Sequence, residues 1–351
     1  MRILLRVMLC VLACCAVASG ANGAAKSRVW KVSDAAGLLA AASEIGADGG
    51  LISIEPGEYE ISEPLVFKAK SGVNFVGSGW STIIKRKGSG DAIVFEGSCW
   101  NCRVHGLRLQ GNKDAKTGSG IVFRKGEWSG ICVVDYCHMD GFPEHGISFE
   151  GDPKKPFSSN TVSKCWLTNN RGDQLHSYYN NDFYFIGNQF GAGSGTYPKT
   201  GARLDHSSAG TYTLNYHWSN VVALRLGPGA NFNRVANNRF EQSRETGILI
   251  GEPKGDICQL NIITGNTIHT NSEGNSGRFN AVEAHNTSAT TFTSNQVFTW
   301  DSNTCKAKSG VVFIDNCRQW IVKDNIIRHC TEKPIICGSK DGHIVKDNIL
   351  E

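Results

Sequence analysis

The chain has 351 residues, of which 40 are glycine and 27 are asparagine, and only 19% are charged. A hydrophobic fraction of 40% is enough for a folded core, which excludes a disordered chain. The net charge is +4, and it falls to +2 (34 basic against 32 acidic residues) without Arg2 and Arg6, which is too balanced for a dedicated nucleic-acid-binding protein. This composition indicates a β protein that is rich in turns.

Residues 1–24 are typical of a signal peptide. Arg2 and Arg6 precede an apolar run from Val7 to Val17 that is too short to cross a bilayer, and Ala16-Val17-Ala18 offers a small-x-small cleavage site. Leu12-Ala13-Cys14 faintly resembles a lipoprotein box, but the stretch before it is short, so we do not expect lipid anchoring. Because no other segment could span a membrane, we predict a secreted, periplasmic or extracellular protein.

Residues 25–70 are expected to form an N-terminal cap and the first strands. Ser33 can cap a short helix over residues 34–45, whose apolar positions include Leu38, Ala42 and Ile45. The helix is followed by Gly49–Ile61, which has the pattern of a strand, a Pro-Gly turn and a second strand.

From residue 71 to residue 351 a short pattern recurs: an apolar residue, two residues, Asn, one residue, and a second apolar residue. The copies centre on one asparagine each, and weaker copies have Leu107, Cys137, Cys165 or Tyr216 in its place. The six strong copies centre on Asn188, Asn238, Asn266, Asn295, Asn325 and Asn348. Over the strong and weak copies together, the spacing is 22 to 30 residues, which suits one coil of a solenoid.

This repeat predicts a single all-β domain, a right-handed parallel β-helix of about ten coils. One coil cannot bury its apolar face alone, whereas a stack forms a continuous core. Asparagine at a fixed turn position can bond its copies above and below. In a β-sandwich, which is the alternative, asparagine would mark ordinary turns, but ten quasi-regular copies favour the solenoid.

The opening strands and the segment Val73–Trp80 resemble the first coil of the pectate-lyase-like β-helix superfamily. The resemblance covers nearly the whole chain after the signal peptide. It implies a carbohydrate-active protein, although many chemistries occur on this scaffold. The sequence lacks the Arg-x-Pro-x-x-Arg signature, the Asp-Pro-His-Asp motif of mannuronan epimerases and the polygalacturonase motifs, so the resemblance does not identify a subgroup.

Ten cysteines lie beyond the signal peptide, and an even number in an exported chain permits disulfides. The single Cys99-x-x-Cys102 pair has no second copy, so we do not expect a zinc site. Several of the other cysteines fall at inward strand positions, where they can be packed thiols.

A second strand in each coil alternates apolar and polar residues, which predicts a charged outer wall across about five coils. The wall is expected to form two neighbouring columns. One column contains Ser148, Gln174, Arg203, Arg225 and Leu249, and the other contains Arg124, Glu150, His176, Asp205 and Gly227. The register at Gln174 is open by two residues, with Asp173 placed inward, but His176 points outward in either register.

These residue types suit a linear acidic polysaccharide. The resemblance implies a lyase in which Arg203 and Arg225 neutralise a uronate carboxylate, His176 removes the C5 proton, Asp205 holds His176, and Tyr178 protonates the leaving oxygen. Further substrate-binding candidates are Arg124, Glu150, Gln174, His206, Tyr216 and Trp218. No cofactor is expected: only Glu150 and Asp205 are acidic on the wall, so calcium has no support.

Two other functions are open at this stage. A glycoside hydrolase or fructosyl transferase needs a pair of carboxyl groups, for which Glu150 with Asp205, or Glu241 with Glu245, could serve. A non-catalytic glycan-binding surface protein would use the same wall without chemistry.

The sequence printed here stops at Asp347–Glu351, directly on a repeat strand with no amphipathic helix after it. Solenoid ends need covering, because an open coil exposes backbone and core. A loop that folds back, such as 338–342, could cover this end. The alternative is a homo-oligomer formed through the uncapped C-terminal coil.

Overall fold

The computed structural model describes residues 28–193, 197–300, 305–337 and 342–351. The predicted signal peptide lies outside these ranges. In the described residues, no helix has the length and apolarity needed to cross a membrane.

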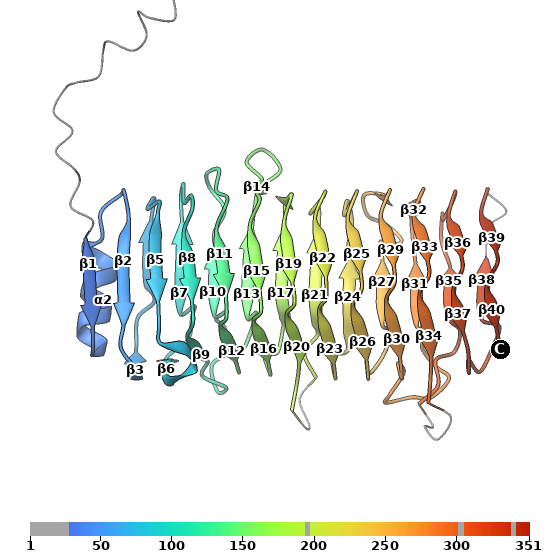
Figure 1. Ribbon diagram of the computed structural model, residues 1–351, viewed down its shortest axis with the longest axis horizontal. Coiled ribbons are helices and arrows are strands. Elements are labelled where there is room, and N and C mark those ends of the chain that lie inside the picture. The colour runs from blue at the N-terminus through green and yellow to red at the C-terminus, as the bar shows by residue number, and fades with distance from the viewer. Residues whose placement is uncertain (1–27, 194–196, 301–304, 338–341) are drawn as a thin grey trace, which may run out of the picture.

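Three parallel sheets run the length of a right-handed β-helix, and each coil contributes one strand to each sheet in turn (Figure 1). Sheet 1 contains β1 (Val29–Val32), β2 (Gly50–Ile54), β5 (Val73–Val76), β8 (Arg103–His105), β11 (Val133–Asp135), β15 (Thr161–Ser163), β19 (Tyr184–Ile186), β22 (Thr211–Thr213), β25 (Arg234–Ala236), β29 (Ile262–Thr264), β33 (Thr291–Thr293), β36 (Ile321–Lys323) and β39 (Ile344–Lys346).

Sheet 2 follows sheet 1 in each coil. It contains β3 (Gly57–Ile61), β6 (Thr82–Arg86), β9 (Arg108–Gln110), β12 (His138–Asp140), β16 (Trp166–Thr168), β20 (Gln189–Gly191), β23 (Tyr216–Trp218), β26 (Arg239–Glu241), β30 (Thr267–His269), β34 (Gln296–Phe298), β37 (Ile326–Ile327) and β40 (Ile349–Leu350).

Sheet 3 completes the coil. It contains β4 (Leu65–Lys68), β7 (Ile93–Glu96), β10 (Ile121–Phe123), β13 (Ile147–Glu150), β17 (Asp173–Tyr178), β21 (Thr200–Asp205), β24 (Val222–Leu226), β27 (Ile248–Ile250), β31 (Val282–Ala284), β35 (Val311–Phe313) and β38 (Ile335–Cys337). Two short pairs, β14 (Phe157–Ser158) with β18 (Asn180–Asn181) and β28 (Cys258–Gln259) with β32 (Thr287–Ser288), lie between sheets 3 and 1.

The predicted fold is confirmed, and the expected helix is present as α2 (Ala35–Glu44) at the N-terminal end of the rod (Figure 1). Its cap is Asp34 rather than Ser33, because the Asp34 carboxylate accepts a hydrogen bond from the Gly37 backbone at 2.7 Å. A carboxylate at this position also interacts favourably with the helix dipole. A 3-10 turn, η1 (Gly79–Ser81), precedes β6.

The asparagine ladder runs along the corner between sheets 1 and 2. From Asn215 onward, each side chain accepts hydrogen bonds from the asparagine of the preceding coil: Asn266 Oδ1 accepts from the Asn238 backbone at 2.9 Å and from its Nδ2 at 3.0 Å. The ladder includes Asn215, which accepts from Asn188, so the assignment of Tyr216 to this position was wrong by one residue. These bonds satisfy turn backbone groups that would otherwise be buried without partners.

Cysteines continue the ladder toward the N-terminus. The Cys165 thiol donates to the Val134 carbonyl at 3.5 Å, in the same way that Asn188 Nδ2 donates to Val162. Burial raises the pKa of the Cys165 thiol well above its usual range, which keeps it protonated as a donor. Buried free thiols are present at Cys99, Cys102, Cys132, Cys137, Cys165 and Cys258. At these positions cysteine is a packed residue.

Inside sheet 3 a column of phenylalanines is stacked coil upon coil. Phe95, Phe123 and Phe149 stack at centroid distances of 4.8 Å. The column stops at β17, where Ser177 pairs with Phe149 and bonds to Ser207 at 3.1 Å. The break in the apolar column therefore coincides with the strand that carries His176.

At the C-terminal end, Ile344, Ile349 and Leu350 are about half exposed. The oligomer that would cover them stays a prediction.

Candidate functional site

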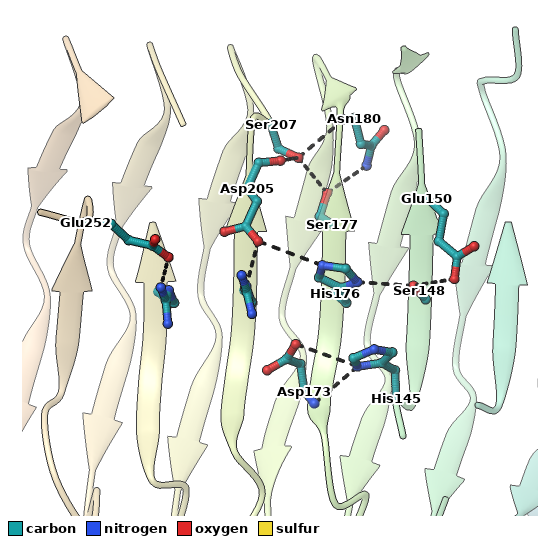
Figure 2. Close-up of polar contacts among 12 residues, drawn as sticks. His145, Ser148, Glu150, Asp173, His176, Ser177, Asn180, Asp205, Ser207 and Glu252 are labelled. Atoms are coloured by element: carbon teal, nitrogen blue, oxygen red, sulfur yellow. Dashed lines mark hydrogen bonds and ion pairs between the residues drawn. The ribbon is translucent and has the colours of Figure 1, made fainter. Parts of the chain in front are cut away.

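A row of polar side chains crosses four strands on the outer face of sheet 3 (Figure 2). Ser148 on β13 pairs with His176 on β17, which pairs with Arg203 on β21 and then with Arg225 on β24. Adjacent strands are about 4.8 Å apart. The structure thus brings His176, Arg203 and Arg225 into one row, with Asp205 beside them.

The register differs from the expected one at His176. His176, and not Gln174, stands in line with Ser148 and Arg203, which is the shift of two residues that the sequence left open. Gln174 is fully buried, where it accepts from Asn170 and donates to the Gly191 carbonyl at 2.6 Å. Its expected contact with substrate is therefore wrong: it lies inside the corner that begins β17.

Asp205 is buried beside the row, with 4% of its surface exposed. Its Oδ2 atom accepts from Arg203 Nε at 2.6 Å and lies 4.0 Å from His176 Nε2. Its Oδ1 atom is buried without a hydrogen-bond partner. Burial raises the pKa of Asp205, while Arg203 opposes this rise.

Gly227 makes room for this carboxylate. A Cβ atom on Gly227 would lie 1.7 Å from Asp205 Oδ1, a distance that no side chain could tolerate. A glycine at this point of the next coil is therefore a packing requirement of Asp205.

His176 is held between neighbours on its own sheet. Its ring stacks on His145 with centroids 4.9 Å apart, and its Nδ1 atom lies 3.4 Å from Ser148 Oγ. Burial, and then the nearby His145, lower the pKa of His176 to about 4. The imidazole is therefore neutral near pH 7 and can accept a proton.

Two residues of this cluster were missed from the sequence. His145 accepts from the Asp173 backbone at 3.2 Å and lies 3.7 Å from the Asp173 carboxylate, as Figure 2 shows. Asp173 was expected to point inward, but its carboxylate lies beside His145, and its Oδ1 atom is buried without a partner. Ser119, His145 and Asp173 each stand two residues before one of the aligned apolar residues Ile121, Ile147 and Leu175, and that column is the signal that could have located them.

The two arginines are each fixed by one carboxylate and remain partly exposed. Arg203 is bound by Asp205, and Arg225 pairs with Glu252. Burial, and then Arg203, lower the pKa of Arg225. A guanidinium group has five donors, so one carboxylate leaves donors available on each arginine. Both can bind an anion that lies against the row.

The N-terminal side of the row carries Glu150 and Arg124. Arg124 Nη2 donates to Asp91 at 2.5 Å, and Ser148 Oγ donates to Glu150 Oε1 at 3.5 Å. Burial, followed by the charge of Asp91, raises the pKa of Glu150. Glu150 is therefore easier to protonate than an ordinary glutamate.

Beyond Tyr178, the surface next to the row has a depression. Tyr178 pairs with Glu150 and Asp205, is 36% exposed, and contacts the His206 ring edge to face at 5.6 Å. The depression has a volume of about 550 Å³ and is lined by Pro153, Pro156, Tyr179, His206 and Asp256 among others. His206 stacks flat on Tyr179 at 4.5 Å. His206 thus lines a hollow next to the row.

Tyr216 and Trp218 lie elsewhere. Both belong to β23 of sheet 2, so they do not join the row on sheet 3, and their expected place beside it was wrong. Both residues directly follow the ladder residue Asn215, so they lie in the strand of sheet 2 that comes after that turn.

Among the described residues, no group of three or more His, Cys, Asp or Glu side chains could hold a metal ion.

No protein-family model and no curated protein matches this chain. Solved structures do match. One is the A-module of the mannuronan C-5 epimerase AlgE6 of Azotobacter vinelandii, with a TM-score of 0.66, 16% identity, and coverage of 90% of this chain and 93% of that chain. The related AlgE4 A-module gives a TM-score of 0.62 at 17% identity, covering 91% and 96%.

A third match is tailspike protein 2 of bacteriophage CAB120 of Escherichia coli O157:H7, with a TM-score of 0.65 and 13% identity. It covers 86% of this chain, which spans 43% of that protein. At these identities the similarity establishes the fold alone, a right-handed parallel β-helix.

Proposed function

We propose that the protein is a polysaccharide lyase that cleaves a uronate-containing polymer by β-elimination. The observation that carries the proposal is the neutral His176 imidazole in one row with two partly exposed arginines. An elimination needs a base that is unprotonated at the working pH and a positive group that stabilises the developing enolate.

The residues of the row can divide the reaction between them. Arg203 and Arg225 bind the uronate carboxylate, which makes the C5 proton more acidic. His176 takes that proton, the electron pair forms the double bond between C4 and C5, and the bond from C4 to the glycosidic oxygen breaks. Tyr178 gives its hydroxyl proton to that oxygen, and Asp205 fixes Arg203 in position.

The solved structures support a sugar polymer as substrate. The epimerase modules are named for a reaction at C5 of mannuronan, and a change at C5 also requires removal of a proton from that carbon. A substrate of this class is therefore consistent with the residues of the row. We also infer that the protein works outside the cytoplasm, in line with the signal peptide that the sequence predicts over residues 1–24.

Hydrolysis is the second candidate, and one observation favours it. Glu150 and Asp205 are separated by the single strand β17, which places their Cα atoms about 10 Å apart, and burial raises the pKa of both. This Cα separation lies just above the roughly 6.5–9.5 Å that separates the two carboxyl groups of an inverting pair. Glu241 is less suitable, because it is buried in sheet 2 and bonded to His269 at 2.9 Å.

A screen of the purified protein against alginate, polygalacturonate, xylan and galactomannan tests the proposal. We expect an unsaturated, ultraviolet-absorbing end to form on an acidic polymer. New reducing ends without that absorbance would contradict the lyase and indicate hydrolysis. Inversion at C5 without chain cleavage, seen by NMR, would contradict both.

A further inference from the structure

The outer face of sheet 2 carries aromatic side chains that the row on sheet 3 does not use. Trp80 and Trp166 are 45% and 36% exposed, and their rings meet at a centroid distance of 5.2 Å. His138 lies beneath them, 5.0 Å from the Trp80 ring. Exposed rings that cluster on a folded surface indicate a binding site more often than isolated ones do.

The cluster borders a hollow at the corner between sheets 1 and 2. The hollow has a volume of about 430 Å³ and is lined by Trp80, His105 and Tyr136 together with Gly79 and Gly106. The His105 and Tyr136 rings meet edge to face at 5.6 Å. The Trp80 indole thus forms one wall of this hollow.

Further along sheet 2, a second pair of rings continues the face. Tyr216 lies two strands along sheet 2 from Trp166, at the same register position and about 10 Å away, with Gln189 on the strand between them. Tyr216 stacks on Trp218 at 5.2 Å. Trp218 lies so close over Gly191 that a Cβ there would be 2.2 Å from the indole. The face therefore alternates flat rings with a hydrogen-bonding amide.

The arginines of this face are already paired within the protein. Arg108 on sheet 2 donates to Asp140 at 2.9 Å, and Arg103, which lies on sheet 1 in the strand that carries His105, donates to Asp135 at 2.6 Å. Arg239 pairs with Glu241 in the same way. A surface whose charges are paired within the protein favours an uncharged ligand. The arginines of the row on sheet 3, in contrast, keep hydrogen-bond donors that are available to a charged ligand.

We propose that this face of sheet 2, centred on Trp80 and Trp166, binds a polysaccharide chain through the apolar faces of its sugar rings. The rings of Trp80, Trp166 and Tyr136, which are 36–47% exposed, present roughly 300 Å². This is well below the ~800 Å² per partner of a stable protein interface, so a narrow ligand fits better than a second protein. The choice of a glycan rests on the proposed function, but the site lies on a different sheet from the row.

The test is electrophoresis of the intact protein through gels that contain alginate, polygalacturonate, xylan or galactomannan, at low and at high salt. High salt screens the contacts that arginines make with a charged polymer, whereas it leaves contacts through ring stacking in place. We expect at least one polymer to retard the protein at high salt, and Trp80→Ala with Trp166→Ala to weaken that retardation at least tenfold. The single variants, and Trp166→Phe, keep the test valid if the double variant fails to fold.

Trp128→Ala is the matched control. Trp128 is 49% exposed but lies in the connection between β10 and β11, away from sheet 2, so its removal should leave the retardation unchanged. Absence of retardation of the wild type at high salt by all four polymers would overturn the proposal. So would equal retardation of the wild type and a folded Trp166→Ala protein, or dimers in sedimentation that Trp166→Ala dissociates without any glycan retention. Retardation requires no turnover, so this result is independent of the lyase assay.

Discussion

The imidazole rings of His145 and His176 stack with centroids 4.9 Å apart at the junction of two successive coils. Protonating one ring would place a positive charge against the other, in addition to the cost of burial. The contact therefore helps to keep His176 neutral, which is the state a proton acceptor needs.

Replacing His145 should move the acid limb of the activity profile. In His145→Phe the ring is kept but its charge cannot form, so the pKa of His176 should rise from about 4 toward its ordinary value. The pH dependence of kcat/KM would show this as an acid limb displaced to higher pH. An unchanged limb would mean that His145 does not influence the group that titrates.

Gly227→Ala should disable the site by displacing one carboxylate. The new Cβ would lie 1.7 Å from Asp205 Oδ1, so Asp205 must turn away from Arg203. We expect kcat/KM to fall by roughly 10²-fold, the usual effect of a misplaced catalytic group. Gly46→Ala is the control, because a Cβ there meets no atom within 4 Å. Full activity of Gly227→Ala would show that the position of Asp205 is not needed.

His176 should also make the fold sensitive to acid. Its pKa is lower in the folded state than in the unfolded chain, so between about pH 6.5 and 4 the unfolded chain binds a proton that the folded protein does not. The contribution of neutral His176 to the free energy of unfolding is complete above pH 6.5. It falls as the pH drops, by up to about 1.4 kcal/mol per pH unit. Urea unfolding at pH 7, 6 and 5 should show a smaller decrease in the free energy of unfolding for His176→Gln than for the wild type.

His285→Gln should have the opposite effect in the same experiment. Glu283, to which His285 is hydrogen bonded at 2.8 Å, raises the pKa of His285. The stabilisation from this pair is therefore present at low pH and lost as the pH rises through the folded pKa. If the two variants changed the pH dependence in the same direction, the assignment of these charge states would be wrong.

Asn266→Ala should weaken the ladder. Asn266 accepts two bonds from Asn238 and donates to Asn295 at 3.0 Å and to the Val235 carbonyl at 3.0 Å. Losing it leaves buried groups without partners, which costs about 1–3 kcal/mol. Chemical denaturation measures the loss, with the exposed Asn74→Ala as control. Equal stability of the two variants would contradict a structural ladder.

The repeat was enough to predict the fold, because most ladder asparagines are followed two residues later by an apolar core residue, as Asn238 is by Phe240 and Asn266 by Ile268. The positions of Arg203 and Arg225 followed from the same logic, since Leu204 and Leu226 beside them are buried. Alternation is a reliable guide wherever the inward residues are apolar.

The register failed at β17 because its inward residue is polar. Ser177 is buried among Ser207 and Asn180, so the apolar alternation that aligned the other strands is interrupted there. Gln174 is buried at the corner, next to the inward Leu175. His145 stands just before β13 and Asp173 is the first residue of β17, so both precede the apolar alternation and were missed for that reason.

The most direct test of the account is turnover by His176→Gln on the acidic polymer that the wild type cleaves. The account predicts loss of the ultraviolet-absorbing product, with a melting temperature near that of the wild type. His285→Gln removes a histidine associated with the same sheet, three strands beyond β21, and should retain turnover. Wild-type turnover by a folded His176→Gln protein would contradict the account, because the elimination would then have another base.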